Sequence, residues 1–478
     1  MSLIKQAKAG VFWTFVQQFS VQLINFSVQI VLARILLPSD FGLIAMIAVF
    51  VALGQTLSDS GMTSSLIRNN ENTENDYGTV FLTNLGVSTF LYGICYAIAP
   101  LVADFYKQEI LADLLRVYAL VFIISAFNVV QLARFSKELD FKSQFTYQLP
   151  SVVIGAITGI VMAYFGFGVW SLIGLNVAQS LVFSVSLWIF YKWRPKFIFD
   201  SSIFKFHFSY GYKLTLSGIL NTLYLNLYKI IIGKKFSASQ VGFFSQADSL
   251  RLFPVNQLNT VLNKVTFPLF SKIKDDDEKL KLAYISSTRL VLSCSSVMMT
   301  ILILIAEPLF LIVFGEKWLP SVPYFQILCL ASVFLPFSSY NLNILKVKGR
   351  SDLFLKVEVI KKIIGVISLL VCIPFGIEAI VWSLCLTNIL FAYINGFFSG
   401  RLLNYNVYSQ VKHSLAIIIV AFIPFLAVYY LNSIYGNMIV GNWFKLFFLS
   451  VSYCILYLPL LFIFNKALLI DIKRIIKR

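Results

Sequence analysis

The sequence predicts an all-α integral membrane protein with about 14 transmembrane helices. Hydrophobic residues make up 58% of the 478 positions and charged residues only 13%, whereas soluble chains carry about 25% charged residues. Apolar runs of roughly the 20 residues that a helix needs to cross a bilayer recur along the chain. These runs are continuous and do not alternate with polar residues, which favours helices over the strands of a membrane barrel.

Hydropathy and helix-breaking residues divide the chain into consecutive segments. The longest loops, at about 192–208 and 271–282, are too short for a folded domain outside the membrane. The first segment is of full length and has no small-residue cleavage pattern, so we expect it to remain as the first helix. The predicted segments are 10–37, 41–66, 78–101, 113–134, 146–165, 168–191, 209–232, 242–270, 283–306, 320–345, 353–373, 376–400, 411–431 and 443–465.

A repeat divides most of the chain into two similar halves. Residues 28–43 and 231–243 each run from an apolar segment through a polar turn to a glycine, and the tetrapeptide Val-Trp-Ser-Leu occurs at 169–172 and at 381–384. Repeats of this kind are typical of transporters. Each repeat holds six helices, an even number, so we expect two parallel lobes. The predicted domains are an N-terminal six-helix lobe at 1–200, a C-terminal six-helix lobe at 201–405, two extra transmembrane helices at 406–465 and a basic cytoplasmic tail at 466–478.

The loop cations set the predicted orientation. With the N-terminus in the cytoplasm, 24 Lys and Arg residues fall on the cytoplasmic side and five on the other side. Cytoplasmic loops carry such an excess of basic residues, so both termini are expected in the cytoplasm. The tail has apolar residues on one helical face and cations opposite, which favours a short helix on acidic lipid or a frayed basic end.

Composition also excludes several classes of function. The net charge of +17 would suit a nucleic-acid-binding protein, but the basic residues lie between apolar runs, so no nucleic acid is expected as partner. The six cysteines fall inside apolar runs without metal-ligand spacing, which predicts neither disulfides nor a metal site. His207 and His413 are interpreted as solvated residues of basic loops. We therefore expect no catalytic residues and no cofactor.

Polar side chains follow one face of the first and of the seventh segment, at positions i, i+4, i+7 and i+11 in both. Amides that face lipid lack partners at a cost of several kcal/mol each, so both stripes should face water or another helix. Their matched spacing favours a shared cavity that contacts sugar, and helix–helix packing is the alternative. The stripes consist of Gln18, Gln22, Asn25 and Gln29 and of Ser217, Asn221, Tyr224 and Tyr228.

Ionisable residues inside apolar segments are costly and by default mark a transport pathway. Basic residues outnumber acidic ones here, and a net positive cavity attracts anions such as a diphosphate. Local pairing is an alternative, because Asp248 lies three residues before Arg251 and Glu358 three before Lys361. Snorkelling to the surface is another alternative for the lysines near segment ends. The candidate diphosphate ligands are Arg251, Lys264, Lys213 and Lys229; the candidate ion-coupling residues are Asp59 and Asp248; the candidate gate residues are Arg34 and Lys361.

Several short motifs resemble those of the polysaccharide transporter branch of the multidrug/oligosaccharidyl-lipid/polysaccharide (MOP) flippase superfamily, which contains the Wzx/WzxC-like O-antigen and colanic-acid flippases. The resemblance is strongest in the N-terminal third of the chain. The motifs are Gly-Val-Phe-Trp at 10–13, Val-Leu-Ala-Arg-Ile-Leu at 31–36, Pro-Ser-Asp-Phe-Gly at 38–42, Asp-Ser-Gly at 59–61, Ile-Gly-Lys at 232–234 and Phe-Pro at 267–268.

The resemblance implies two six-helix lobes around a central cavity, often followed by two extra helices. It implies a flippase that moves an undecaprenyl-diphosphate-linked oligosaccharide from the inner to the outer leaflet of the bacterial cytoplasmic (inner) membrane by alternating access, for export of O-antigen, capsule or exopolysaccharide. Its expected partners are the lipid-linked oligosaccharide, membrane lipid and, as a candidate, a polysaccharide polymerase. The transporter is expected to be a monomer, with H⁺ or Na⁺ as candidate coupling ions. Relatives often carry an acidic residue five positions before the Ile-Gly glycine, where this chain has Tyr228.

Two other classes remain as alternatives. A cation-exporting multidrug antiporter of the same superfamily would need acidic cavity residues, and Asp59 and Asp248 are few and offset by cations. A membrane polysaccharide polymerase or ligase would be expected to carry a large outer loop with catalytic Arg, His or Glu. The outer loops of this chain are short and hold only five cations.

Overall fold

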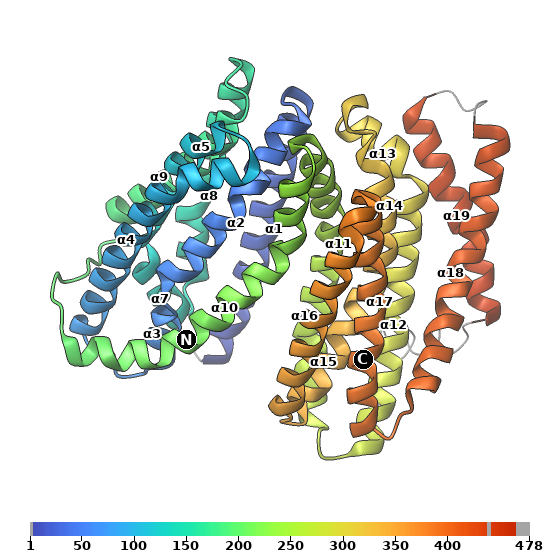
Figure 1. The fold of residues 1–478 in the computed structure, drawn as a ribbon. Helices are drawn as coiled ribbons and strands as arrows, with labels where there is room; N and C mark the ends of the chain where they lie inside the picture. Colours follow the sequence, from blue (N-terminus) through green and yellow to red (C-terminus); the bar gives the residue numbers. More distant parts are fainter. Residues whose placement is uncertain (1–2, 437–440, 465–478) are drawn as a thin grey trace. The chain divides into compact units, whose positions relative to one another are not determined.

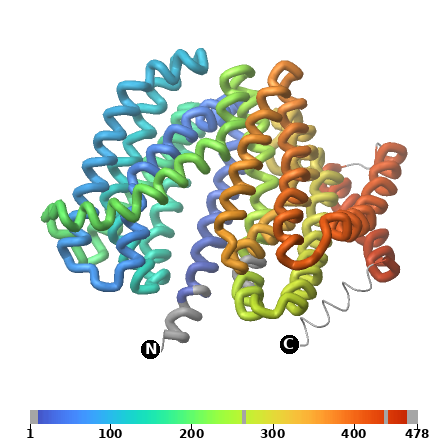
Figure 2. The backbone as a smooth tube through the Cα atoms, turned by 60° about the horizontal axis from the view of Figure 1, so that its bottom comes forward, coloured from blue at the N-terminus to red at the C-terminus, as the bar shows by residue number. Residues whose placement is uncertain are grey.

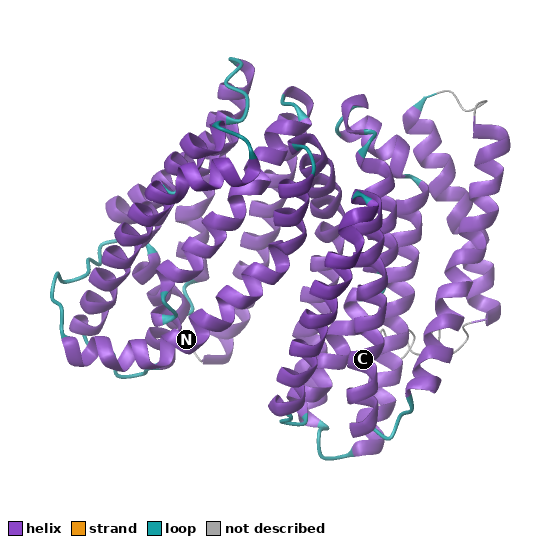
Figure 3. Ribbon diagram, viewed as in Figure 1, coloured by secondary structure: helices purple, strands orange, loops and turns teal. Residues whose placement is uncertain are grey.

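The computed structural model describes residues 3–436 and 441–464, without the side chains of residues 3–9, 11 and 261–265. The described residues form helices joined by short loops (Figure 3). They group into two compact units, Met1–Gly242 and Phe243–Arg478, which we call the first and the second unit. The predicted tail at 466–478 lies outside the described residues, and the predicted division into two lobes at residue 200 stays a prediction.

The first unit contains ten helices of the described part of the chain and the first turn of an eleventh (Figure 1). In this unit α1 packs against α8, and α8 against α9. The helices are α1 (Leu3–Ile35), α2 (Pro38–Asp59), α3 (Met62–Arg68), α4 (Glu74–Tyr106), α5 (Ile110–Tyr118), α6 (Leu120–Ala126), α7 (Val129–Glu138), α8 (Phe141–Tyr164), α9 (Trp170–Phe190), α10 (Ser201–Lys235) and the start of α11 (Ala238–Lys272).

The second unit contains the rest of α11 and the helices that follow. Here α18 and α19 (red in Figure 2) lie side by side and pack on α12, where the Tyr453 hydroxyl lies 2.8 Å from that of Thr300. The helices are α12 (Asp277–Leu304), α13 (Ala306–Val313), α14 (Ser321–Ser332), α15 (Leu335–Val347), α16 (Ser351–Cys372), α17 (Ile377–Leu402), α18 (Val407–Tyr435) and α19 (Asn442–Phe464), with the 3₁₀ helices η1 (Glu316–Trp318) and η2 (Ile373–Phe375).

The repeated stretch forms the same local structure in both copies. The Asp40 carboxylate accepts a hydrogen bond from the Leu37 amide at 2.9 Å and closes the turn before α2. The Gln240 side chain, 200 positions later, accepts one from the Ser237 amide at 3.2 Å before α11. In both copies, a side chain three residues further along the chain accepts a hydrogen bond from a backbone amide that has no partner within the helix. The predicted match between residues 31–43 and 231–243 is confirmed at this level.

The number of membrane spans is supported only in part. Within residues 3–436 and 441–464, ten helices are long and apolar enough to cross a membrane, or eleven when the bent run from α5 to α7 counts as one span. The others of sufficient length, α10, α11 and α16, carry most of the charged residues that the sequence places inside segments. The figure of about 14 transmembrane helices therefore remains a prediction.

Several predicted segments differ from the structure. The segment at 41–66 forms α2 and α3, and the segment at 320–345 forms α14 and α15. The segment at 113–134 is not one helix, because the chain bends by 46° between Ala126 and Val129. Trp188 of α9 donates a hydrogen bond to the Phe127 carbonyl at 2.9 Å, and the side-chain amide of Asn128 donates one to the Ser184 hydroxyl at 3.0 Å, so partners on α9 stabilise the break.

The seventh segment also begins earlier than residue 209. Asp200 caps α10 by accepting hydrogen bonds from the amides of Ser202 at 2.7 Å and Ile203 at 3.2 Å. The Ser202 hydroxyl and these two amides hold the pKa of Asp200 below its ordinary value. The helix therefore begins eight residues earlier than predicted, and His207 lies on the helix and not in a loop.

Candidate functional site

The polar stripes of α1 and α10 both lie on the surface of the first unit. Gln18, Asn25, Ser217 and Asn221 are exposed. Gln22, Gln29 and Tyr224 are half-buried. Tyr228, the last residue of the α10 stripe, is buried, so the other seven stripe residues are the ones accessible from outside the packed interior of their unit. Their role in binding sugar stays a prediction.

Arg251 lies in a buried polar cluster of the second unit. The residue is 5% exposed. Its Nε and Nη2 donate to Asp248 Oδ1 at 3.0 and 2.7 Å, and its Nη1 donates to Ser332 Oγ at 2.7 Å. The predicted pairing with Asp248 is confirmed. A diphosphate that binds here must take over hydrogen bonds that Asp248 and Ser332 now receive.

The other candidate cations are spread over several helices. Lys213 is exposed, with its Nζ 5.8 Å from the centre of the Tyr212 ring, and Lys229 is half-buried. Lys361 is 8% exposed and pairs with Glu358, which confirms the predicted local pair. Arg34 is exposed at the end of α1. Lys213 and Lys229 belong to the first unit and Arg251 to the second, so neither unit alone brings the candidate diphosphate ligands together. The side chain of Lys264 lies outside the described residues.

A pocket of about 300 Å³ lies in the first unit, and we call it the polar pocket because nine of its fourteen lining residues are polar. Asp59 is the one predicted site residue in it. Among the residues that line it, the acidic group is Asp59, and no lysine or arginine is present. The polar lining comes from four regions: Gln55, Ser58 and Asp59 of α2, Ser125 and Asn128 near the bend of α6 and α7, Gln148 and Ser151 of α8, and Gln179 and Ser180 of α9.

Hydrogen bonds fix part of this lining and leave part of it available. Asp59 accepts from the Thr63 hydroxyl, and Gln148 accepts from the Gln17 amide of α1 at 2.6 Å. The Ser58 hydroxyl is buried and has no hydrogen-bond partner among the described residues. Such a group normally bonds to water or a ligand. Amides and hydroxyls around one carboxylate can bind a hydroxyl-rich molecule, and the carboxylate can hold a proton or a monovalent cation.

Sequence reasoning missed all of this pocket except Asp59. A signal was present in two helices, because Gln55 with Ser58 and Asp59 and Gln148 with Ser151 are spaced to lie on one face of α2 and of α8. Only the packing of α2, α6, α7, α8 and α9 brings them to one cavity.

The prediction for His207 is wrong. Its side chain is fully buried in the first unit, where Nε2 lies 3.0 Å from Asp76 Oδ1 and Nδ1 lies 2.8 Å from the Ser65 hydroxyl. The early start of α10 at Ser201 places His207 on a helix and turns it toward α3 and α4. Ser65 and Asp76 are also buried, so the three residues hold α10 against α3 and α4 inside the unit. His413 is exposed as predicted, but it lies on α18 and not in a loop.

Comparison with known proteins places the chain in a family. Residues 31–323 match the family described as polysaccharide biosynthesis protein. The teichuronic acid biosynthesis protein TuaB of Bacillus subtilis is 25% identical over 74% of this chain and 73% of its own length. The lipopolysaccharide biosynthesis protein WzxC of Escherichia coli is 26% identical over 76% and 74%. The succinoglycan biosynthesis transport protein ExoT of Rhizobium meliloti is 25% identical over 75% and 73%.

The fold is that of MOP transporters. The lipid II flippase MurJ in an inward closed conformation superposes with a TM-score of 0.74 and 14% identity, over 96% of this chain and 100% of MurJ. An inward-facing MATE multidrug transporter gives a TM-score of 0.63 at 15% identity, over 80% and 94%. The chain is thus a multi-pass membrane protein that belongs to the polysaccharide biosynthesis protein family, and its fold is the one that MurJ and the MATE transporter of the MOP superfamily share.

Proposed function

We propose that this protein is a flippase that moves an undecaprenyl-diphosphate-linked oligosaccharide from the cytoplasmic to the outer leaflet of the inner membrane. The family match over residues 31–323 carries the proposal. The names of the relatives concern biosynthesis of cell-surface polysaccharides, and one is called a transport protein. The solved structure of the lipid II flippase MurJ has the same fold over nearly the whole chain, so the fold accommodates this function, although the fold by itself does not set the substrate.

The physical task is to carry a charged, sugar-bearing head group across about 30 Å of hydrocarbon. A polar path in the protein replaces water around the diphosphate and the sugar hydroxyls, while the lipid tail stays in the bilayer. Arg251 is the proposed diphosphate contact, together with Lys213, Lys229 and Lys264. The stripes of α1 and α10 and the polar pocket of the first unit offer amides and hydroxyls for the sugar.

Several finer features belong to the same proposal. They comprise 14 transmembrane helices in two parallel six-helix lobes with two extra helices, both termini in the cytoplasm, a monomeric transporter and a polysaccharide polymerase as downstream partner. Asp59 and Asp248 are the proposed coupling residues for H⁺ or Na⁺, and Arg34 and Lys361 the proposed gate residues. The loop cations support the orientation, and the position of Asp59 in a pocket without basic residues supports coupling there.

Deletion of the gene in its own bacterium tests the function. Lipid-linked repeat units should accumulate on the cytoplasmic side and surface polysaccharide should disappear, and the wild-type gene should restore both. The variant Arg251→Glu/Lys264→Glu should not restore export, because it reverses two charges proposed to bind the diphosphate. Wild-type levels of surface polysaccharide with this variant contradict the anion site, and unchanged polysaccharide in the deletion strain contradicts the flippase.

If the protein were a drug antiporter, deletion of its gene would change resistance to cationic drugs and leave surface polysaccharide intact. Only the fold of the MATE neighbour points toward this class, and fold alone does not set the substrate.

A further inference from the structure

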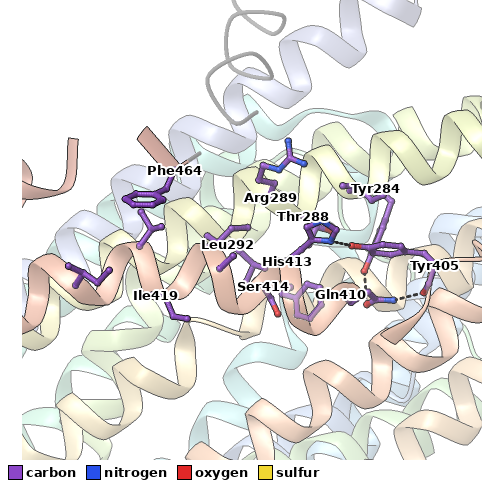
Figure 4. A pocket seen from close by; sticks show the side chains of 16 residues that line it. Tyr284, Thr288, Arg289, Leu292, Tyr405, Gln410, His413, Ser414, Ile419 and Phe464 are labelled. Atoms are coloured by element: carbon purple, nitrogen blue, oxygen red, sulfur yellow. Dashed lines mark hydrogen bonds between the residues drawn. The ribbon is translucent and has the colours of Figure 1, made fainter. Parts of the chain in front are cut away.

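A second pocket, of about 440 Å³, lies in the second unit between α12 and α18 (Figure 4). Both helices begin at this end of the unit, and the Tyr284 ring of α12 packs edge-on against Tyr405, which lies just before α18, with centroids 6.2 Å apart. The lining belongs to one unit, and it is separate from Arg251 and from the polar pocket of the first unit.

The lining divides into a polar end and an apolar end. Figure 4 shows Tyr405 and Gln410 on one side and Ile419 and Phe464 toward the other, with Arg289 above the centre. The apolar part follows α18 from Ile417 through Val420 to Ile423. A site with a polar head region and an apolar run fits an amphiphile.

The polar end is built as a rigid frame. Gln410 is 3% exposed, and its amide donates to the carbonyl of Gly396 at 2.8 Å and to that of Tyr405 at 3.2 Å. The Tyr284 hydroxyl of α12 donates to Asn341 at 2.5 Å and to Gln410 Oε1 at 3.3 Å, and the Tyr405 hydroxyl lies 2.6 Å from His413 Nδ1. These bonds fix the start of α18 against α17 and α12, so the head region keeps its shape.

The charge of the pocket selects an anion. Sixteen residues line it, and none of them is Asp or Glu, whereas Arg289 supplies a guanidinium group. Guanidinium groups bind phosphates with strong, charge-assisted hydrogen bonds. His413, Thr288 and Ser414 add polar groups nearby.

The head region and the apolar run together match one leaflet. From His413 to Ile423 α18 advances by ten residues, a rise of about 15 Å, of which the apolar run from Ile417 accounts for about 9 Å. The whole rise is half of the roughly 30 Å hydrocarbon core. Ile419 and Ile423 are about half exposed, so the run is open toward the bilayer. A chain that extends through both leaflets, such as that of a polyprenyl carrier, is longer than this run.

We infer that the pocket between α12 and α18 binds an anionic glycerophospholipid, with the phosphate at Arg289 and one acyl chain along Ile417, Val420 and Ile423. The predicted orientation places the head group in the cytoplasmic leaflet, because α12 and α18 begin after cytoplasmic loops. The inference does not depend on the transported substrate. The bound lipid would contact both α12 and α18 and so join α18 to the helices before it.

Native mass spectrometry of the purified full-length protein tests the inference. Dioleoyl phosphatidylglycerol should bind in preference to dioleoyl phosphatidylcholine, and Arg289→Gln should weaken phosphatidylglycerol binding about tenfold, because one charge-assisted contact is lost. Lys412→Gln is the matched control, since Lys412 is exposed beside His413 but does not line the pocket. It should bind phosphatidylglycerol as the wild type does.

A second pair of variants blocks the apolar part without changing charge. Ala416 lines the pocket and Leu415 beside it does not, so Ala416→Trp should reduce phosphatidylglycerol binding and Leu415→Trp should not. Equal binding by wild type, Arg289→Gln and Ala416→Trp overturns the site. Tighter binding of undecaprenyl phosphate than of phosphatidylglycerol, lost in Arg289→Gln, overturns the choice of a glycerophospholipid. Loss of polysaccharide export tests the flippase and is measured separately.

Discussion

Gly42 and Gly242 pack backbone to backbone within the first unit. A Cβ atom on Gly42 would lie 1.7 Å from the carbonyl oxygen of Ala238, and one on Gly242 would lie 1.9 Å from that of Pro38. The two copies of the repeated turn therefore meet each other, and each requires a glycine at the position where the other passes. This contact gives a steric reason for both glycines of the repeat.

Gly42→Ala and Gly242→Ala should each destabilise the protein by several kcal/mol, because a side chain at these positions overlaps a carbonyl that belongs to a packed helix start. The measurement is the melting temperature and the monodisperse yield of the purified protein. Gly86→Ala is the matched control, because a Cβ atom there meets nothing within 4 Å in α4. Equal melting temperatures for the three variants would show that the turns separate without cost.

Variants of the ion pair between Arg251 and Asp248 distinguish a role in stability from a role in substrate binding. Arg251→Gln leaves the largely buried Asp248 carboxylate without its cation and should destabilise the protein by about 3 kcal/mol. Asp248→Asn/Arg251→Gln removes both charges and should recover most of that stability. If Arg251 contacts the diphosphate, the double variant folds but does not export polysaccharide.

Thermal unfolding in detergent and surface polysaccharide in the deletion strain are the two measurements. The exposed pair Arg350 and Asp352, joined at 2.7 Å, provides the control, and Asp352→Asn/Arg350→Gln should change neither. Full export by the stable Asp248→Asn/Arg251→Gln variant would assign this ion pair a purely structural role.

The burial of His207 indicates that this residue contributes to the stability of the first unit. His207→Ala removes the partner of Asp76 Oδ1 and of the Ser65 hydroxyl and leaves a cavity, so we expect a loss of about 2–4 kcal/mol. Phe206→Ala, at the adjacent exposed position, should cost far less. Melting temperatures of the two variants decide the point. A melting temperature for His207→Ala equal to that of the wild type is incompatible with a packed contact.

Local sequence patterns predicted part of the site correctly. Asp248 with Arg251 and Glu358 with Lys361 are pairs three residues apart on a helix, so spacing alone brings them together. The repeated turn was also predictable, because its polar residues and its glycine recur at a fixed offset. The apolar runs likewise predicted a helical membrane protein, because each run is a continuous local feature of the sequence.

Contacts between distant helices were not predictable in this way. The polar pocket joins Asp59 to Gln148 and Gln179, residues far apart in the chain, and no single helix displays them as a pattern. His207 was misplaced because its surroundings are basic in sequence, whereas its partners Ser65 and Asp76 come from other helices.

Asp59 should control coupling to an ion gradient. It is the carboxylate among the lining residues of the polar pocket, and it accepts a hydrogen bond from the Thr63 hydroxyl. Asp59→Asn keeps the size of the side chain and removes its charge, so it can no longer exchange a proton or hold a cation. We expect the variant to bind lipid-linked oligosaccharide with wild-type affinity and to lose acceleration of transport by an imposed H⁺ or Na⁺ gradient.

Proteoliposomes with a fixed inward or outward gradient allow this measurement. Asp104→Asn, an exposed carboxylate of α4 away from the pocket, should keep the response to the gradient. The two ions are distinguished by imposing each gradient alone at constant membrane potential, since only the coupling ion accelerates the wild type. An Asp59→Asn protein that responds to the gradient as the wild type does would move the coupling site away from the first unit and leave Asp248, already bound to Arg251 in the second unit, as the remaining acidic candidate.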